Sequence, residues 1–84
     1  MTDAIIPEAP SWKGREAIAS RFGRRLRELR LSRGYTQVEL DSLAGPDRTF
    51  ISEIENGHKE PTLHKLEEFA DAFSMTVSEL LDGV

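Results

Sequence analysis

Several residue types and patterns are missing from this chain of 84 residues, and each absence excludes a class of structure or function. It contains no cysteine, which excludes disulfides and thiolate metal sites. No apolar run approaches the roughly 20 residues of a membrane-spanning helix, and nothing resembles a signal peptide, so we expect a cytoplasmic protein with no membrane partner. A glycine-rich phosphate loop, a Ser/His/Asp arrangement and a metal-ligand spacing are also missing. We therefore expect no enzyme activity, no cofactor, no metal and no small-molecule ligand.

Positive charge is concentrated in the first part of the chain. The net charge is −4, whereas a nucleic-acid-binding domain is expected to carry a basic face. Residues 1–34 carry eight basic and four acidic side chains, a local charge of +4, and residues 35–84 carry three basic and eleven acidic ones, a local charge of −8. Because phosphate binding depends on local potential, the acidic total does not exclude a nucleic-acid partner.

Helical periodicity begins at about Ala17, and the chain is short enough to form only one hydrophobic core. The apolar positions of the first helix lie four, four and three residues apart: Ile18, Phe22, Leu26 and Leu29. Gly23 inside this helix indicates a close packing contact, and Gly34 ends the helix. Two prolines and a glycine precede it without a helical period. We therefore assign residues 1–16 to an N-terminal arm and residues 17–84 to the folded domain.

Four shorter helices are predicted after the first. Capping boxes open the second and the fifth, where a threonine and a glutamate three residues later can satisfy each other's amides. The expected bounds are Thr36 to Gly45 for the second helix, Arg48 to about Asn56 with Asp47 as cap for the third, Pro61-Thr62 as the start of the fourth, and Thr76 as the start of the fifth. Their inward positions include Leu40, Ala44, Ile51, Ile54, Leu63, Leu66, Phe69, Ala70 and Phe73, and the fifth helix contains Leu80 and Leu81. No segment has the period of a strand, so the fold class is all-α.

The segment from Gln37 to Gly57 has the layout of a helix-turn-helix. Two short helices are joined by a tight turn at a glycine, and the second has few buried positions and a polar outer face. In such a motif the first helix supports the second, which projects far enough to enter a major groove. The spacing alone fits two ordinary core helices equally well.

Between Phe22 and Leu63, several residue types occur in a characteristic order and spacing. They read Phe22-Gly23, Leu26, Leu29-Arg30, Gly34-Tyr35-Thr36-Gln37, Glu39-Leu40, Ala44-Gly45, Ile51-Ser52, Ile54-Glu55-Asn56-Gly57 and Pro61-Thr62-Leu63. This pattern resembles the phage-repressor (Cro/C1, xenobiotic-response-element) family of helix-turn-helix domains over about residues 18–82. The resemblance implies a five-helix, lambda-repressor-like bundle that binds double-stranded DNA and regulates transcription. Within the family, Asp47-Arg48-Thr49-Phe50-Ile51-Ser52 resembles the recognition segment of restriction–modification controller proteins.

The resemblance also assigns roles to individual residues. Those facing base edges would be Arg48, Thr49, Ser52 and Glu53. Those holding phosphates would be Gln37, Asn56, His58, Lys59 and Thr62. The guanidinium fork of Arg48 suits guanine O6 and N7, and the helix start at Gln37 favours an anion. A solvated side chain is the alternative for Arg48 and Glu53, and His58 and His64 are read as surface histidines without a metal.

An ion pair and three departures from the family pattern complete this comparison. Arg30 and Glu55 are expected to pair, partly buried, and to tie the third helix to the scaffold. Asp41 stands where the family usually has alanine, Pro46 where it has an aliphatic residue, and Phe50 where the controller proteins often have tyrosine. These departures affect the expected DNA contacts more than the fold.

We expect a homodimer, because one such domain reads only a few base pairs and tight binding usually requires two copies on a palindromic site. Candidate dimer residues, for which ordinary core packing is the equal alternative, are Met75, Val77 and Leu81. The arm could instead contact the partner or its own first helix through Ile5, Ile6 and Trp12. The alternative function is an antitoxin-like protein-interaction module with secondary DNA binding. The sequence does not distinguish an activator from a repressor.

Overall fold

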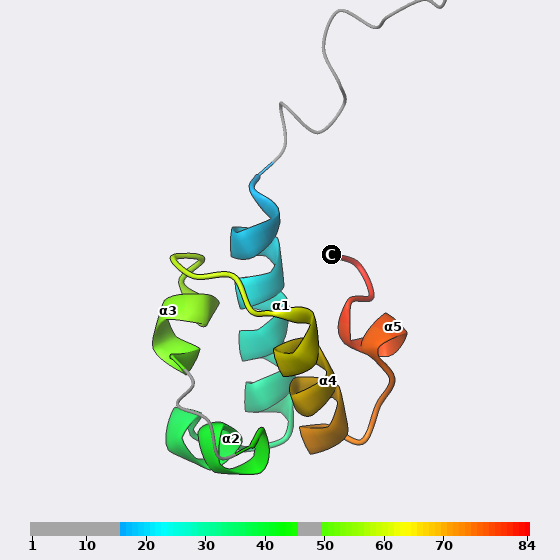
Figure 1. Cartoon of the computed structure of the whole chain (residues 1–84). Coiled ribbons are helices and arrows are strands. Elements are labelled where there is room, and N and C mark those ends of the chain that lie inside the picture. The colour runs from blue at the N-terminus through cyan, green and yellow to red at the C-terminus, as the bar shows by residue number, and fades with distance from the viewer. Residues whose placement is uncertain (1–15, 46–49) are drawn as a thin grey trace, which may run out of the picture.

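The computed structural model describes residues 16–45 and 50–84, which form five α-helices and no strand, so the all-α prediction is confirmed. Figure 1 shows α1 in the middle, with α2 and α3 on one side and α4 and α5 on the other. The helices are α1 Ile18–Ser32, α2 Gln37–Leu43, α3 Ile51–Glu55, α4 Leu63–Ala72 and α5 Val77–Leu80. No helix in this part of the chain is long and apolar enough to cross a membrane.

Threonine caps open three of the helices. The Thr36 hydroxyl accepts a hydrogen bond from the Glu39 amide at 3.0 Å, and the Thr36 amide donates to the Glu39 carboxylate at 2.7 Å. Thr76 and Glu79 repeat this reciprocal pair at α5. Both predicted capping boxes are therefore confirmed. Such a pair satisfies two amides that have no partner inside the helix, which fixes where each short helix begins.

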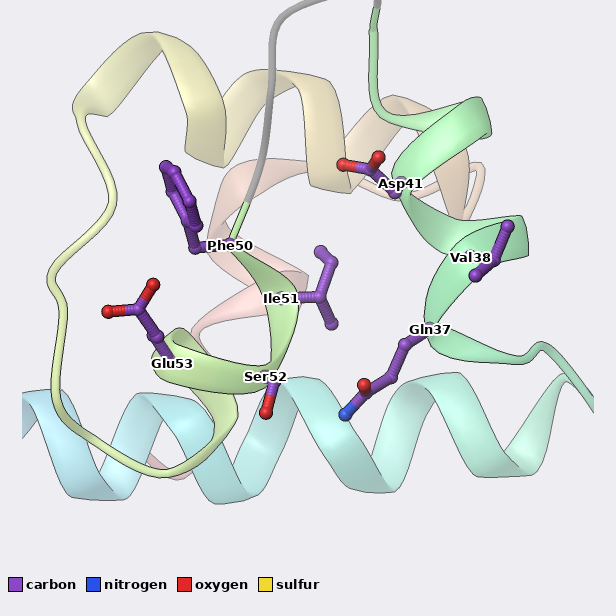
Figure 2. A pocket seen from close by; sticks show the side chains of 7 residues that line it. All are labelled: Gln37, Val38, Asp41, Phe50, Ile51, Ser52 and Glu53. Carbon is purple, nitrogen blue, oxygen red and sulfur yellow. The ribbon is translucent and has the colours of Figure 1, made fainter.

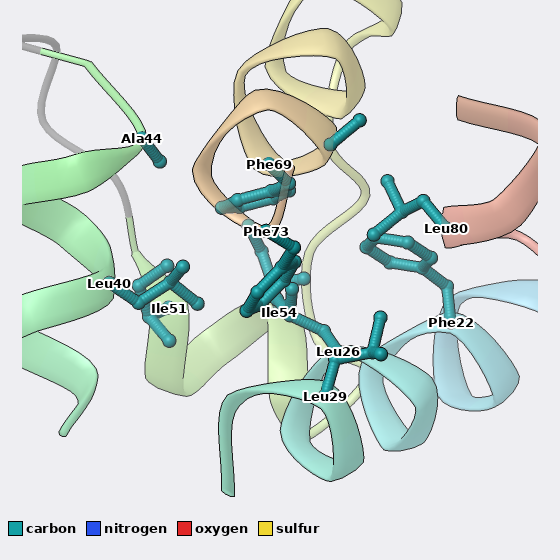
Figure 3. Close-up of a cluster of buried hydrophobic side chains, with 11 residues drawn as sticks. Phe22, Leu26, Leu29, Leu40, Ala44, Ile51, Ile54, Phe69, Phe73 and Leu80 are labelled. Atoms are coloured by element: carbon teal, nitrogen blue, oxygen red, sulfur yellow. The ribbon is translucent and has the colours of Figure 1, made fainter. Parts of the chain in front are cut away.

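A single hydrophobic core joins all five helices (Figure 3). Its buried members are Phe22, Leu26, Leu29, Leu40, Ala44, Ile51, Ile54, Phe69, Ala70, Phe73 and Leu80. Leu63 was expected among them but is 82% exposed. It is the first residue of α4, and the apolar stripe of that helix extends one turn beyond the core. The proposed dimer residues Met75, Val77 and Leu81 are partly buried against this core, which favours their interpretation as packing residues.

The third helix begins later than the sequence predicts. Phe50 has φ −95° and ψ 69°, outside the helical region, and its carbonyl accepts the first helical hydrogen bond from the Ile54 amide at 2.9 Å. Phe50 is therefore the residue before the helix, and its predicted inclusion in the helix is wrong. Ile51 and Ile54 already place one turn of α3 in the core, so no longer helix is needed to bury them. The predicted cap Asp47 and the predicted start Arg48 lie outside the described residues.

Candidate nucleic-acid interface

The short α3 has one buried side and one exposed polar side. Ile51 and Ile54 are each 3% exposed, whereas Ser52, Glu53 and Asn56 are exposed. Gln37, Ser52 and Glu53 line part of a hollow of about 240 Å³ where α2 meets α3 (Figure 2). The described side chains that are predicted to read base edges or hold phosphates are thus exposed, except that of Gln37, which is half-buried.

Close backbone contact fixes α3 against α1. A Cβ atom added to Gly23 would overlap the carbonyl oxygen of Ile54 and would lie 2.6 Å from that of Glu55. Only glycine fits this position, so the close contact predicted from its place inside α1 is confirmed. The chain after α3 is also close to α1, because a Cβ atom at Gly57 would lie 2.6 Å from the Ser20 hydroxyl oxygen. These two contacts place α3 across α1 with little space between the backbones.

The structure contains the ion pair between Arg30 and Glu55 that the family resemblance implies. Arg30 Nε lies 2.6 Å from Glu55 Oε2, and the second guanidinium bond, from Nη2 to Oε1, is 3.0 Å long. The two side chains are only 10% and 4% exposed. The hydrogen bonds that Arg30 donates to the Glu55 carboxylate raise the pKa of Arg30 above its ordinary value in spite of desolvation. A third bond from Arg30, 2.9 Å to the Tyr35 carbonyl, also joins α1 to the approach to α2.

Gln37 is part of the same network. Its side-chain nitrogen donates to Glu55 Oε1 at 3.1 Å, so it links the start of α2 to the end of α3. Sequence reasoning placed Gln37 on a phosphate and did not find this contact. A glutamine 18 residues before a glutamate gives no local signal, so only the folded arrangement reveals it.

The loop between α3 and α4 contains the four other predicted phosphate residues, Asn56, His58, Lys59 and Thr62. His58 is exposed, and its backbone amide donates to the Glu53 carbonyl at the end of α3. The Lys59 ammonium lies 3.8 Å from the centre of the Phe50 ring, a cation–π contact that the sequence did not indicate. Thr62 caps α4 by accepting from the Lys65 amide at 3.1 Å. The predicted base-reading residues Arg48 and Thr49 lie outside the described residues, as does Pro46.

The arginines of α1 serve mainly as internal contacts. Arg25 donates to the carbonyls of Leu80 and Glu79 at the end of α5, and Arg33 donates to the Phe73 carbonyl at the end of α4. Arg24 pairs with the exposed Glu16. Cations at helix C-termini complement the dipole and the unpaired carbonyls there. Among the described residues, Arg25, Arg30 and Arg33 therefore join α1 and its end to other helices.

Asp41, which replaces the usual alanine of α2, is half-buried and lines the hollow between α2 and α3. Its Oδ1 atom is buried and accepts no hydrogen bond from the described residues. Within residues 16–45 and 50–84, no three histidine, aspartate or glutamate side chains are grouped so that they could hold a metal ion.

Comparison with known proteins identifies this arrangement. A family model described as helix-turn-helix matches residues 26–80, more than half of the chain. The chain belongs to the helix-turn-helix family of the Cro/C1 type. This family match, together with relatives that are named transcriptional regulators and control proteins, supports a DNA-binding transcriptional regulator.

Named relatives show the kinds of protein that this helix-turn-helix chain resembles. The control protein C.MunI of a Mycoplasma species is 36% identical over 70 residues, covering 80% of this chain and 92% of the relative. The transcriptional regulator DdrOP3 of Deinococcus deserti is 37% identical over 60 residues, and this match spans 71% of the chain but only 46% of that longer protein. The crystal structure of the restriction-modification controller protein C.AhdI from Aeromonas hydrophila matches with a TM-score of 0.70 and 35% identity, over 77% of this chain and 98% of that one.

Proposed function

We propose that this regulator binds a palindromic operator in double-stranded DNA as a homodimer, with α3 in the major groove. The observation that carries the proposal is the two-sided character of α3. Gly23 and the Arg30–Glu55 pair hold its inner side, while Ser52, Glu53 and Asn56 remain exposed on the outer side. A rigidly held helix with free polar side chains is what direct reading of base edges requires.

The roles within this interface follow from the chemistry of the side chains. Arg48 and Thr49 precede α3, and with Ser52 they are proposed to contact base edges, Arg48 as the donor pair for guanine. Glu53 can only accept hydrogen bonds, so it selects a cytosine amine or repels other sequences. Gln37, which starts α2, is proposed to bind a phosphate through its backbone amide, because its side-chain nitrogen already contacts Glu55.

Phosphate binding beyond α3 is assigned to exposed groups near the end of that helix. These are Asn56, His58, Lys59 and Thr62. Lys59 is the lysine of this set, and its ammonium lies over the Phe50 ring directly before α3. Phe50 thus holds the ammonium beside the helix that enters the groove. Lys59 contributes an attraction that is independent of sequence.

Dimerisation supplies the affinity that one small domain lacks. Two copies related by a two-fold axis would place their α3 helices about 34 Å apart, one turn of DNA. The expected operator is therefore a palindrome with half-sites about 10 base pairs apart, centre to centre.

Selection of bound sequences from random duplexes tests the function directly. We expect a palindrome to be enriched, and sedimentation should show two chains on each selected duplex. Arg48→Ala should weaken binding by about 1–3 kcal/mol and relax preference at one base position, whereas Lys59→Ala should weaken all sequences alike. Arg27→Ala is the matched control, since it removes one positive charge and Arg27 is exposed on α1 with no assigned contact with DNA. Failure to enrich any sequence would contradict the proposal and favour a protein-interaction module.

A further inference from the structure

An ion pair on α4 has no assigned role among the proposed DNA contacts. Lys65 Nζ and Glu68 Oε1 are 2.6 Å apart, and their side chains are only 12% and 17% exposed. Their neighbour Glu67 is 71% exposed on the same helix. A long lysine side chain and a carboxylate are rarely covered to this extent on a small surface helix unless they pack against another element.

The element that they pack against is the end of α2. Lys65 Nζ lies 3.4 Å from the carbonyl oxygen of Ala44, the residue that ends this helix and is itself 1% exposed. An ammonium suits this position, because the last carbonyls of a helix have no partner within it and carry partial negative charge. Lys65 therefore satisfies a carbonyl at the point where the chain leaves α2.

Glu68 occupies the space beside the next residue. Gly45 has φ +119°, a conformation that favours glycine, and a Cβ atom there would overlap the Glu68 carboxylate. The two charged side chains thus surround the consecutive residues Ala44 and Gly45. Lys65 also lines a hollow with Phe50 and Ile54, so it borders the region where the chain enters α3 as well.

We propose that Lys65 and Glu68 are positioning residues for sequence-specific DNA binding. They fix the exit from α2 and thereby the placement of α3, without contacting DNA themselves. This inference rests on the proposed function, since it explains how α3 is held in the position in which it enters the groove. Because the pair acts through the geometry of the motif, it affects specific binding and leaves non-specific attraction to phosphates unchanged.

The sign of the effect separates this role from simple electrostatics. DNA is a polyanion, so removing any glutamate should raise the affinity for every duplex slightly. Glu67→Gln is the matched control, with the same change of charge and shape one residue away. We expect Glu67→Gln to raise affinity for operator and random duplex alike. We expect Glu68→Gln to lower operator affinity about tenfold and to leave random-duplex affinity at or above that of the unchanged protein.

The experiment measures binding of the full chain to the selected operator and to a random duplex, at a temperature where circular dichroism shows each variant folded. Lys65→Met removes the other member of the pair and should produce a similar loss of specificity. The double variant should lose no more than the stronger single variant, since both changes disrupt one contact. The proposal is overturned if Glu68→Gln behaves like Glu67→Gln, or if the two losses simply add.

A second readout does not depend on DNA. The Ala44 amide donates to the Leu40 carbonyl at 2.9 Å, and its hydrogen exchange reports whether the end of α2 stays closed. Glu68→Gln should accelerate exchange at Ala44 about tenfold, while Glu67→Gln should not. If the unchanged protein binds no duplex, the proposed function fails. Hydrogen exchange at Ala44 still decides whether Lys65 and Glu68 hold the end of α2. Unchanged exchange at Ala44 would overturn the positioning role itself.

Discussion

Replacing Glu55 with glutamine tests the contact that holds α3 to the scaffold. The carboxylate receives two bonds from Arg30 and one from Gln37, and it is 4% exposed. Glutamine has nearly the same shape, so the change removes the charge and leaves packing almost intact. Arg30 would then remain protonated and nearly buried, with the Tyr35 carbonyl as a neutral partner.

The magnitude follows from the charge that is left without its partner. Removing one member of a buried ion pair costs about 3–5 kcal/mol. Glutamine retains one acceptor oxygen, and Arg30 retains Tyr35, so we expect the lower end, about 3 kcal/mol. For a domain of 60–100 residues, each kcal/mol lowers the melting temperature by about 4–8 °C, which gives a decrease of about 12–24 °C.

Thermal and urea unfolding followed by circular dichroism provide the assay. The control is Glu16→Gln, which removes an exposed ion pair with Arg24 at 2.8 Å and should change stability little. The double variant Arg30→Leu/Glu55→Leu should recover part of the loss, because it leaves no unpaired charge. A melting temperature for Glu55→Gln within a few degrees of the unchanged protein would refute the reasoning. It would mean that water reaches Arg30 and screens its charge.

Three further predictions concern caps and close contacts. Hydrogen bonds from Thr36 and Thr76 lower the pKa values of Glu39 and Glu79 below their ordinary 4.5, so the folded state binds fewer protons than the unfolded one. The stability that these bonds contribute is complete above pH 4.5 and is lost as the pH falls through the lowered pKa values of the two glutamates. Replacing both glutamates with glutamine should therefore make stability, measured by urea unfolding, less dependent on pH in the acid range. Gly23→Ala should lower the melting temperature. Alanine favours the helix by about 1 kcal/mol, but overpacking against α3 costs about 1–3 kcal/mol. A higher melting temperature would show that α3 can move away from α1. Arg33→Gln should lower stability but leave the salt dependence of duplex binding unchanged, and a shallower dependence would place Arg33 on DNA.

Local chemistry explains which parts of the fold could be predicted. The capping boxes at Thr36 and Thr76 depend on residues three apart, so the sequence contains the whole signal. Gly23 was predictable as a close contact because glycine is unfavourable inside a helix unless packing requires it. The pairing of Arg30 with Glu55 joins residues 25 apart, and only the family resemblance pointed to it.

The features that the sequence did not reveal are contacts between distant elements. Lys59 over Phe50, Gln37 on Glu55 and Lys65 at Ala44 each join side chains whose spacing carries no periodic signal. Periodicity was also misleading at Leu63, because it describes the apolar face of a helix and cannot say where the core ends. The start of α3 depends on the same tertiary packing, since two buried isoleucines suffice to anchor the helix.

The distribution of charge constrains how this regulator can attract DNA. The chain carries a net charge of −4, and arginines of α1 that would form a basic stripe instead cap α4 and α5 or join Glu55. Arg25, Arg30 and Arg33 are therefore not available for phosphates, and the dependence of binding on salt scales with the number of phosphates neutralised. Non-specific attraction should accordingly be weak for a DNA-binding protein. Under the proposed function, recognition depends on the accurate placement of α3, which is what Gly23, Glu55 and the α4 ion pair determine.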